Sequence, residues 1–244
     1  MKIGVLETGA PPSDLAQRFG RYDAMFQRLL SSRHEMQTFK VNKGELPGPD
    51  ARFGAYLVTG SPAGVYDDLP WIEPLGQFLC AVKGKAKLVG FCFGHQMMAQ
   101  AFGGRVIKSP KGWGVGLHRY AITEHRPWMD QAVAIRIPAS HQDQVVEPPS
   151  NTRVIAASDF TPFAGLAYDD QPAISFQAHP EFEPAYAQAL LVERRGTVAP
   201  EVAEAAIVSL DGPNDCARLG RWIDNFLDGV SASHRWPGPI GQDG

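Results

Sequence analysis

The fold and the chemistry of this chain are both indicated by residues 88–98, which read LVGFCFGHQMM. An apolar run suited to a buried strand ends at Cys92, and a helix-forming stretch from Gln96 to Phe102 follows a single turn later. A nucleophile on such a strand-to-helix turn forms a nucleophile elbow, which lifts the side chain out of the sheet. The helix N-terminus favours the thiolate, the reactive form of cysteine. The pattern predicts a nucleophilic Cys92, with a small cysteine buried in a core strand as the alternative.

Strands and helices alternate on the N-terminal side of this stretch. Apolar periodicity predicts strands at residues 2–6, 36–41, 55–59 and 87–91. It also predicts a helix capped by Ser13 that continues to Leu30, and another from Trp71 to Val82. Such alternation favours a parallel sheet with helices on both faces.

The pattern changes after Gly104. Short strand-like segments separated by proline and glycine are predicted at residues 105–107, 114–122, 132–137, 153–157, 164–168 and 173–176. Helices follow at residues 185–193, 200–210 and 215–227. The sequence therefore predicts an α/β fold with a mostly parallel central sheet, an antiparallel portion and a helical C-terminal extension.

Composition excludes several classes of protein. The 244 residues carry 23 Lys and Arg against 26 Asp and Glu, so no basic excess attracts nucleic acid or an anionic membrane. No apolar run is long enough to span a bilayer. The N-terminus reads directly as a strand without a signal-peptide layout, and three widely spaced cysteines give no disulfide framework. These features predict a cytoplasmic location.

A base and its orienting group are predicted at His179 and Glu181, which follow the strand-like run 173–176. In open parallel sheets, sites form at the carboxyl ends of strands, so we expect His179 beside Cys92. Pro180 restricts the backbone between the two side chains. The alternative is a surface histidine in an ordinary proline turn.

Backbone amides are the candidate donors to an oxyanion. The Phe93 N–H follows the nucleophile, where such an elbow places its first donor. A second donor is expected from the loop that begins at Gly60 and Ser61, directly after the strand 55–59. The alternative is a plain turn, which glycine and proline also favour.

These motifs together resemble the class I (triad) glutamine amidotransferases. The resemblance rests on G-x-C-x-G-H-Q at 90–96, H-P-E at 179–181 and the glycine loop at Gly60, in that order. The stretch SHQDQV at 140–145 is similar to the S-H-x-D-x-V segment of the GMP synthetase glutaminase domain. The stretch KGWGVG at 111–116 lies where relatives carry a glutamine-pocket loop.

The resemblance implies a flavodoxin-like three-layer sandwich and assigns the site residues. It implies catalytic roles for Cys92, His179 and Glu181, oxyanion donors at Phe93, Gly60 and Ser61, and a substrate pocket that includes Gln96 and His141. It implies neither a metal nor another cofactor. The oxyanion loop departs from the pattern, because relatives usually have glycine where Ser61 precedes Pro62. A serine can offer its amide there unless the turn requires a positive φ.

Three functions stay open at this point. In the first, the chain hydrolyses glutamine and releases ammonia to a separate synthetase, because its length is used by one glutaminase-like domain and it lacks a G-x-x-x-x-G-K-[ST] motif. In the second, it is a standalone γ-glutamyl peptidase. In the third, it is a silent binding module. We expect residues 1–184 to form the amidotransferase domain, 185–235 a helical extension packed on it, and 236–244 a loose tail.

Overall fold

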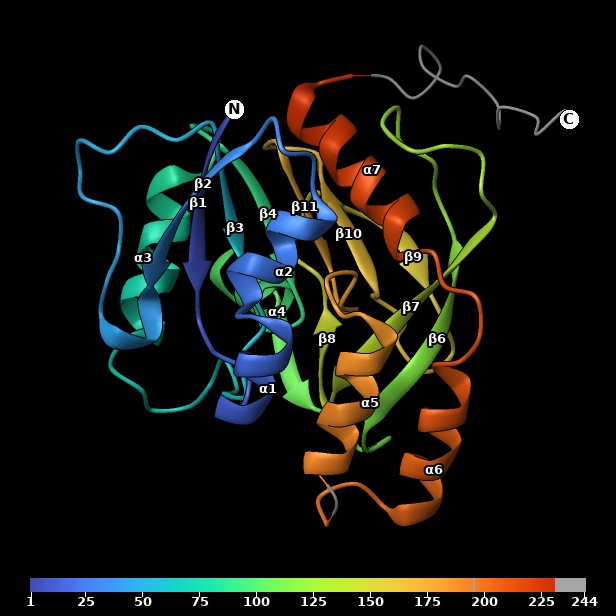
Figure 1. The fold of residues 1–244 in the computed structure, drawn as a ribbon. Helices are drawn as coiled ribbons and strands as arrows, with labels where there is room; N and C mark the ends of the chain where they lie inside the picture. Colours follow the sequence, from blue (N-terminus) through green and yellow to red (C-terminus); the bar gives the residue numbers. More distant parts are fainter. Residues whose placement is uncertain (195, 231–244) are drawn as a thin grey trace, which may run out of the picture.

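A nine-stranded mixed sheet forms the centre of the computed structural model, which describes residues 1–194 and 196–230 (Figure 1). The strand order is β2–β1–β3–β4–β11–β10–β9–β6–β7. The strands of this sheet are β1 (Lys2–Glu7), β2 (Glu35–Lys40), β3 (Ala55–Val58), β4 (Lys87–Phe91), β6 (Gly114–Ile122), β7 (Ala134–His141), β9 (Thr152–Ala157), β10 (Gly165–Tyr168) and β11 (Ala173–Phe176).

The sheet divides into two halves that meet at β11. Strands β2, β1, β3, β4 and β11 are parallel to their neighbours, whereas the pairs from β11 through β10, β9 and β6 to β7 are antiparallel. A separate antiparallel pair is formed by β5 (Arg105–Lys108) and β8 (Asp143–Glu147). The predicted α/β class, with a parallel portion joined to an antiparallel one, is confirmed.

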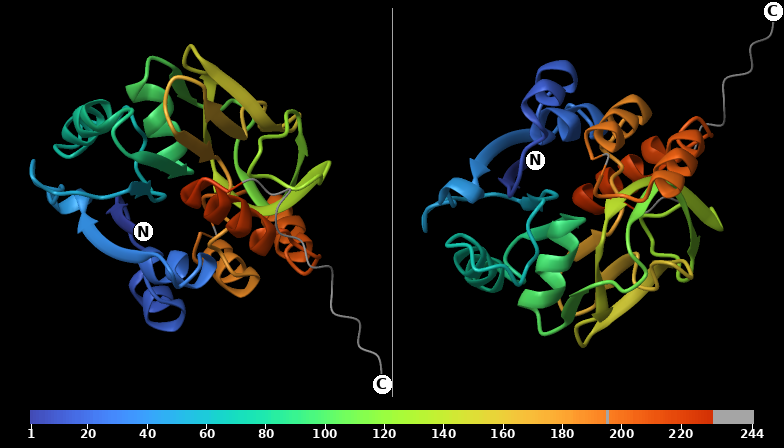
Figure 2. Two further views of the ribbon diagram at one scale, coloured as in Figure 1. Left: turned by 90° about the horizontal axis from the view of Figure 1, so that it is seen from above. Right: turned by 90° about the horizontal axis from the view of Figure 1, so that it is seen from below.

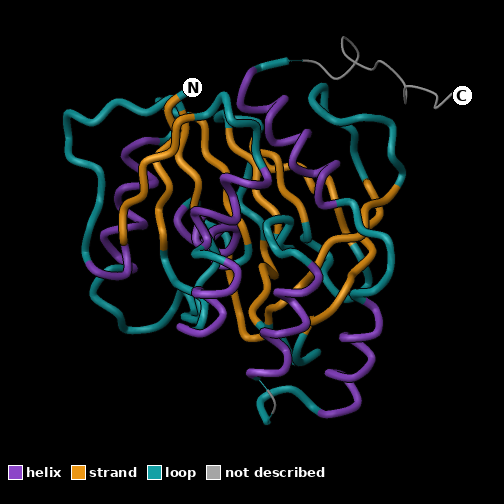
Figure 3. Tube along the Cα trace, in the orientation of Figure 1, coloured by secondary structure: helices purple, strands orange, loops and turns teal. Residues whose placement is uncertain are grey.

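Helices cover both faces of the sheet and complete the three layers (Figures 2 and 3). The helices are α1 (Ser13–Phe19), α2 (Tyr22–Leu29), α3 (Ile72–Val82), α4 (Phe93–Ala101), α5 (Pro184–Glu193), α6 (Pro200–Ser209) and α7 (Cys216–Asp228). On one face, α2 and α7 bury Phe26 and Trp222 against Val5 and Val89. On the other face, α3 and α4 pack on the alternate residues of the same strands.

The segment predicted as one helix from Ser13 to Leu30 is two helices. The break lies at Gly20, whose φ of 86° and ψ of 174° are incompatible with a continuous helix and suit glycine. The predicted cap is also wrong, because Pro12 occupies the N-cap position and no side chain caps the helix. The apolar periodicity continued across the break because both helices bury the same side, with Leu15 and Phe26 in the core.

Strand β7 is longer than predicted, and β8 was not predicted. The prediction ended at Ile137 because proline interrupts central strands, but β7 continues through Pro138 to His141. Strand β7 lies at the edge of the sheet, where a missing N–H leaves no ladder bond unmade. This continuation carries Ser140 and His141 to the carboxyl edge of the parallel strands, where the site lies.

The C-terminal helices pack on the same body as the sheet. Helix α6 crosses β6 at Gly116, where a Cβ would lie 2.7 Å from the Ala206 Cα. The Ser209 hydroxyl accepts a hydrogen bond from the Leu117 N–H at 2.8 Å. The predicted loose tail at residues 236–244 falls outside the described residues. Within residues 1–194 and 196–230, no helix is both long and apolar enough to cross a membrane.

Candidate active site

Cys92 occupies a strained backbone position between β4 and α4. Its φ of 49° and ψ of −106° lie outside the ordinary regions for a residue with a Cβ. The Cys92 N–H donates to the Phe176 carbonyl at 2.9 Å, and the Cys92 carbonyl accepts from the Gln96 N–H at 3.0 Å. Hydrogen bonds on both sides therefore hold the strained turn, as is common at functional sites.

The glycines of the G-x-C-x-G motif are required by close approach of the backbone. A Cβ at Gly90 would lie 2.6 Å from the Gly94 carbonyl oxygen, and a Cβ at Gly94 would lie 2.3 Å from the Val58 carbonyl oxygen. Because both positions lack a side chain, α4 begins at Phe93, three residues earlier than predicted. The Phe93 N–H is at the first helical position, where it has no intrahelical acceptor.

His179 and Glu181 form a buried pair at the same edge. The His179 Nδ1–H donates to Glu181 Oε1 at 2.8 Å, which leaves Nε2 as the ring nitrogen free for proton transfer. Burial lowers the pKa of His179, but the negative charges of Glu181 and Cys92 outweigh it and raise the pKa to about 10. The arrangement suits an imidazolium beside a thiolate at neutral pH.

The ring of Phe182 fixes the plane of the imidazole. It stacks on His179 with the ring centroids 4.0 Å apart and the planes 8° from parallel. The His179 N–H also donates to the Pro138 carbonyl of β7 at 2.8 Å. The histidine is thus held at its backbone, at Nδ1 and on one ring face, and only small displacements are open to it.

Gly60 lies against both reactive side chains. A Cβ at this position would be 2.8 Å from His179 Cε1 and 3.7 Å from Cys92 Cβ. Within the described residues, Ser61 is not among those with positive φ, so the turn accepts a serine in place of the usual glycine. The departure noted in the sequence therefore leaves the Ser61 amide available as a donor.

Three hydroxyl groups hold the Gly60–Ser61 peptide. The Gly60 carbonyl accepts from Thr8 Oγ1 at 3.1 Å and from Thr59 Oγ1 at 3.2 Å. The Ser61 hydroxyl donates to the Thr8 carbonyl at 2.9 Å. In a trans peptide the C=O and N–H point in opposite directions, so anchoring the carbonyl directs the Ser61 N–H away from the Thr8 and Thr59 hydroxyls. We refer to these hydroxyls as the hydroxyl clamp.

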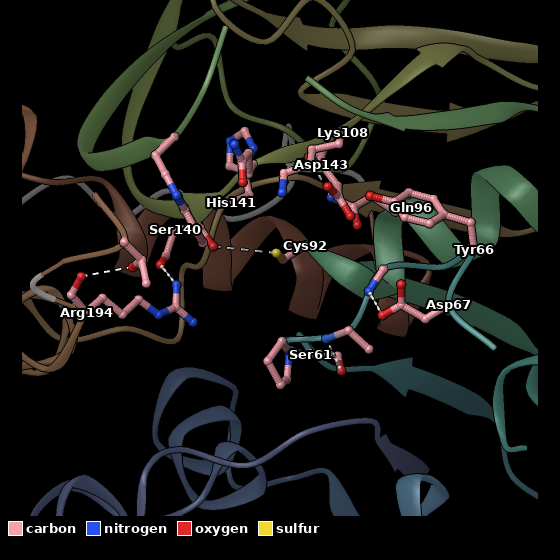
Figure 4. A pocket seen from close by; sticks show the side chains of 16 residues that line it. Ser61, Tyr66, Asp67, Cys92, Gln96, Lys108, Ser140, His141, Asp143 and Arg194 are labelled. Carbon is pink, nitrogen blue, oxygen red and sulfur yellow. Dashed lines mark hydrogen bonds between the residues drawn. The ribbon is translucent and has the colours of Figure 1, made fainter. Parts of the chain in front are cut away.

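A pocket of about 490 Å³ opens in front of Cys92 (Figure 4). On one side of the sulfur lie Gln96 and Asp143, and on the other lie Ser140 and Arg194 (Figure 4). Cys92 Sγ donates to the Ser140 carbonyl at 3.9 Å. The volume falls in the range of pockets that enclose small-molecule ligands.

The two residues predicted to bind substrate both line this pocket. Gln96 Nε2 donates to the Asp143 carbonyl at 2.7 Å and to Gln177 Oε1 at 3.1 Å, so its amide is fixed. His141 is buried, and neither ring nitrogen has a hydrogen-bond partner within the described residues. Burial first, and then the charges on His118 and His179, lower the pKa of His141 to about 3, so the imidazole is neutral.

Sequence reasoning missed three residues of the pocket wall. Arg194 follows α5, far along the chain from Cys92, and no sequence signal connected the two. Trp113 belongs to the predicted pocket loop, but its ring was not assigned a role. Tyr66 stands at the rim, where burial first, and then contact with Asp143, raises its pKa to about 12.

Comparison with known proteins decides the family. The family described as glutamine amidotransferase class-I matches residues 22–196, which contain every predicted catalytic residue. The chain belongs to the class-I glutamine amidotransferase family. The arrangement of the enzyme family on an α/β sheet thus agrees with the fold predicted from the sequence.

The relatives of this amidotransferase fall into different functional groups. A glutamine amidotransferase-like protein of Schizosaccharomyces pombe is 30% identical and covers 92% of this chain and 98% of its own length. γ-Glutamyl peptidase 2 of Arabidopsis thaliana is 29% identical and covers 90% and 93%. A subunit of the glutamine-hydrolysing GMP synthase of Ignicoccus hospitalis is 30% identical and covers 67% and 85%.

A solved structure extends the agreement to the whole fold. The glutamine amidotransferase of Methylobacillus flagellatus aligns with a TM-score of 0.72 at 16% identity, covering 97% of this chain and 99% of that one. The alignment thus includes the C-terminal helices. Within residues 1–194 and 196–230, no group of three or more His, Cys, Asp or Glu side chains is arranged to hold a metal ion.

Proposed function

We propose that this enzyme hydrolyses the γ-amide bond of glutamine or of related γ-glutamyl compounds through a thioester at Cys92. The observation that carries the proposal is the strained Cys92 facing a pocket, with the buried His179–Glu181 pair at the same strand edge. A nucleophile, a base and an orienting carboxylate are the parts that acyl transfer by a thiolate requires.

The reaction follows from these positions. The Cys92 thiolate attacks the γ-carbonyl carbon, and the Phe93 and Ser61 N–H groups donate to the oxygen as it gains charge. The carbon–nitrogen bond then breaks, and the His179 imidazolium gives its proton to the leaving amine. Water attacks the thioester, His179 takes a proton from it, and glutamate leaves as the thiolate is restored. Glu181 keeps His179 in the orientation and charge state that both steps need.

In the first form of the proposal, the substrate is glutamine and the leaving amine is ammonia, which passes to a separate acceptor enzyme. Similarity to a GMP synthase subunit supports a glutamine-related substrate and a synthetase partner. The three free cysteines support work in a reducing compartment such as the cytoplasm.

In the second form, the enzyme acts alone as a γ-glutamyl peptidase. Two observations favour this form. The pocket continues past Cys92 towards Arg194, beyond the groups that fix Gln96. The similarity to γ-glutamyl peptidase 2 covers nine-tenths of both chains, whereas that to the GMP synthase subunit covers two-thirds of this one. A silent binding module is disfavoured, because the strain at Cys92 and the charge on His179 serve catalysis rather than packing.

The test measures glutamate release from glutamine and from γ-glutamyl dipeptides by the purified protein. We expect Cys92→Ala to lower kcat by at least about a thousandfold on every substrate that is turned over. Cys80→Ala is the matched control, because Cys80 is an exposed cysteine on α3 and is absent from the pocket wall. Full activity of Cys92→Ala would refute the mechanism. The preferred substrate separates the two forms.

A further inference from the structure

Arg194 places an unpaired positive charge in the wall of the catalytic pocket. Its guanidinium donates to the Ser140 hydroxyl at 2.7 Å and lies over the Trp113 ring, 5.3 Å from the centroid. Within residues 1–194 and 196–230, no carboxylate lies within ion-pair distance of it. A half-buried guanidinium held by a hydroxyl and an aromatic ring keeps several N–H donors free for an anion.

Arg194 lies on the side of the pocket that His179 occupies. The short β7 segment from Pro138 to Ser140 contacts all three groups: the Pro138 carbonyl accepts from the His179 N–H, and the Ser140 carbonyl accepts from Cys92 Sγ. The Ser140 hydroxyl then accepts from Arg194. Helix α5 gives the same placement, because its Tyr186 packs on Phe182, which stacks on the imidazole, and Arg194 directly follows this helix.

The glutamyl half of a substrate has its own place on the opposite side. Gln96 and Asp143 lie across Cys92 from Arg194, and the free ring nitrogens of His141 lie between the two sides (Figure 4). The leaving amine receives its proton from His179. Whatever is attached to the scissile nitrogen therefore extends towards His179 and Arg194.

We propose that Arg194, with the Ser140 hydroxyl and the Trp113 ring, binds the free carboxylate of the amino acid or peptide that leaves. The proposal rests on the hydrolysis proposed above and identifies its substrate class as γ-glutamyl amino acids and peptides. A guanidinium binds a carboxylate through paired N–H donors, and this pairing is stronger than a bond between neutral groups. Ammonia, the amine that leaves from glutamine, carries nothing for this site to bind.

The experiment compares three substrates that share the glutamyl half. These are γ-glutamylalanine, its carboxamide γ-glutamylalaninamide, and glutamine, and glutamate release is measured for each. We expect the wild-type enzyme to prefer the acid over the carboxamide. Arg194→Gln should lower kcat/KM for the acid by about 10- to 100-fold, the range of a hydrogen bond to a charged group. It should change kcat/KM for the carboxamide and for glutamine by less than about threefold, and Arg194→Lys should retain part of the preference.

The matched control is Arg105→Gln, which removes an exposed arginine that pairs with Glu147 on the two-stranded sheet. It should leave all three substrates unchanged. An equal loss on all three substrates for Arg194→Gln would place the residue at the glutamyl half and overturn the proposal. Unchanged selectivity would overturn it as well. If the wild-type enzyme turns over none of the three in a Cys92-dependent way, the proposed hydrolysis itself fails.

Discussion

Substitution of Gly60 by alanine tests the contact between the oxyanion loop and the catalytic histidine. The added Cβ would lie 2.8 Å from His179 Cε1, about 0.6 Å inside the 3.4 Å at which ordinary van der Waals contact begins. The imidazole cannot easily yield, because Glu181 holds Nδ1 at 2.8 Å and Phe182 covers one ring face at 4.0 Å. Either the histidine or the loop must therefore move by several tenths of an ångström.

Both displacements act on the reaction more than on binding. A shift of about 1 Å in a reacting group costs on the order of a hundredfold in rate, so we expect kcat to fall by about 10- to 100-fold. The substrate pocket is lined by other residues, and KM should change by less than about threefold. Overpacking at this buried position should lower the free energy of unfolding by about 1–3 kcal/mol.

The assay is steady-state hydrolysis of the best γ-glutamyl substrate, with thermal unfolding measured in parallel. Gly48→Ala is the matched control, because a Cβ at Gly48 meets nothing within 4 Å. It should leave kcat and Tm close to wild type. If Gly60→Ala keeps kcat within about twofold of wild type, the close approach at His179 does not constrain the reaction and the reasoning is refuted.

Two further substitutions test the groups that support the site. Glu181→Gln removes the first of the two charges that raise the pKa of His179 to about 10, so burial lowers this pKa and the alkaline limb of the pH–rate profile should move down from near pH 10. An unmoved limb in a folded variant would contradict this assignment. Thr8→Val removes a clamp hydroxyl and should lower kcat about tenfold with little change in KM, whereas Thr8→Ser should restore most of it. Thr152→Val, which removes a hydroxyl of β9 that donates to the Pro149 carbonyl, should leave kcat unchanged, and an equal loss in both valine variants would argue against the clamp.

The alternation of strands and helices was readable because each element is periodic over its own length. The elbow at Cys92 was readable for the same reason, since a buried strand, a cysteine and a helix follow one another without a gap. The sequence could not show that the helix begins at Phe93. That depends on Gly94 lying against the Val58 carbonyl, which is a contact between distant parts of the chain.

Strand β7 shows why local rules failed at a place that matters for the site. Pro138 ends a strand in most settings, and it was interpreted so here. The edge position of β7, which only the assembled sheet defines, removes the penalty. The continuation then supplies Ser140 to Cys92 and Arg194, and the carbonyl of Pro138 to His179.

The sequence by itself determined the family, the α/β class and the residues expected to react, because these depend on motifs and on periodicity within single elements. Only the tertiary structure decided that Gly60 presses on His179 and that three hydroxyls fix the Ser61 amide. It alone placed the unpaired charge of Arg194 beside the leaving amine. These features are contacts between residues far apart in the chain, and their energies depend on distances that no local pattern encodes.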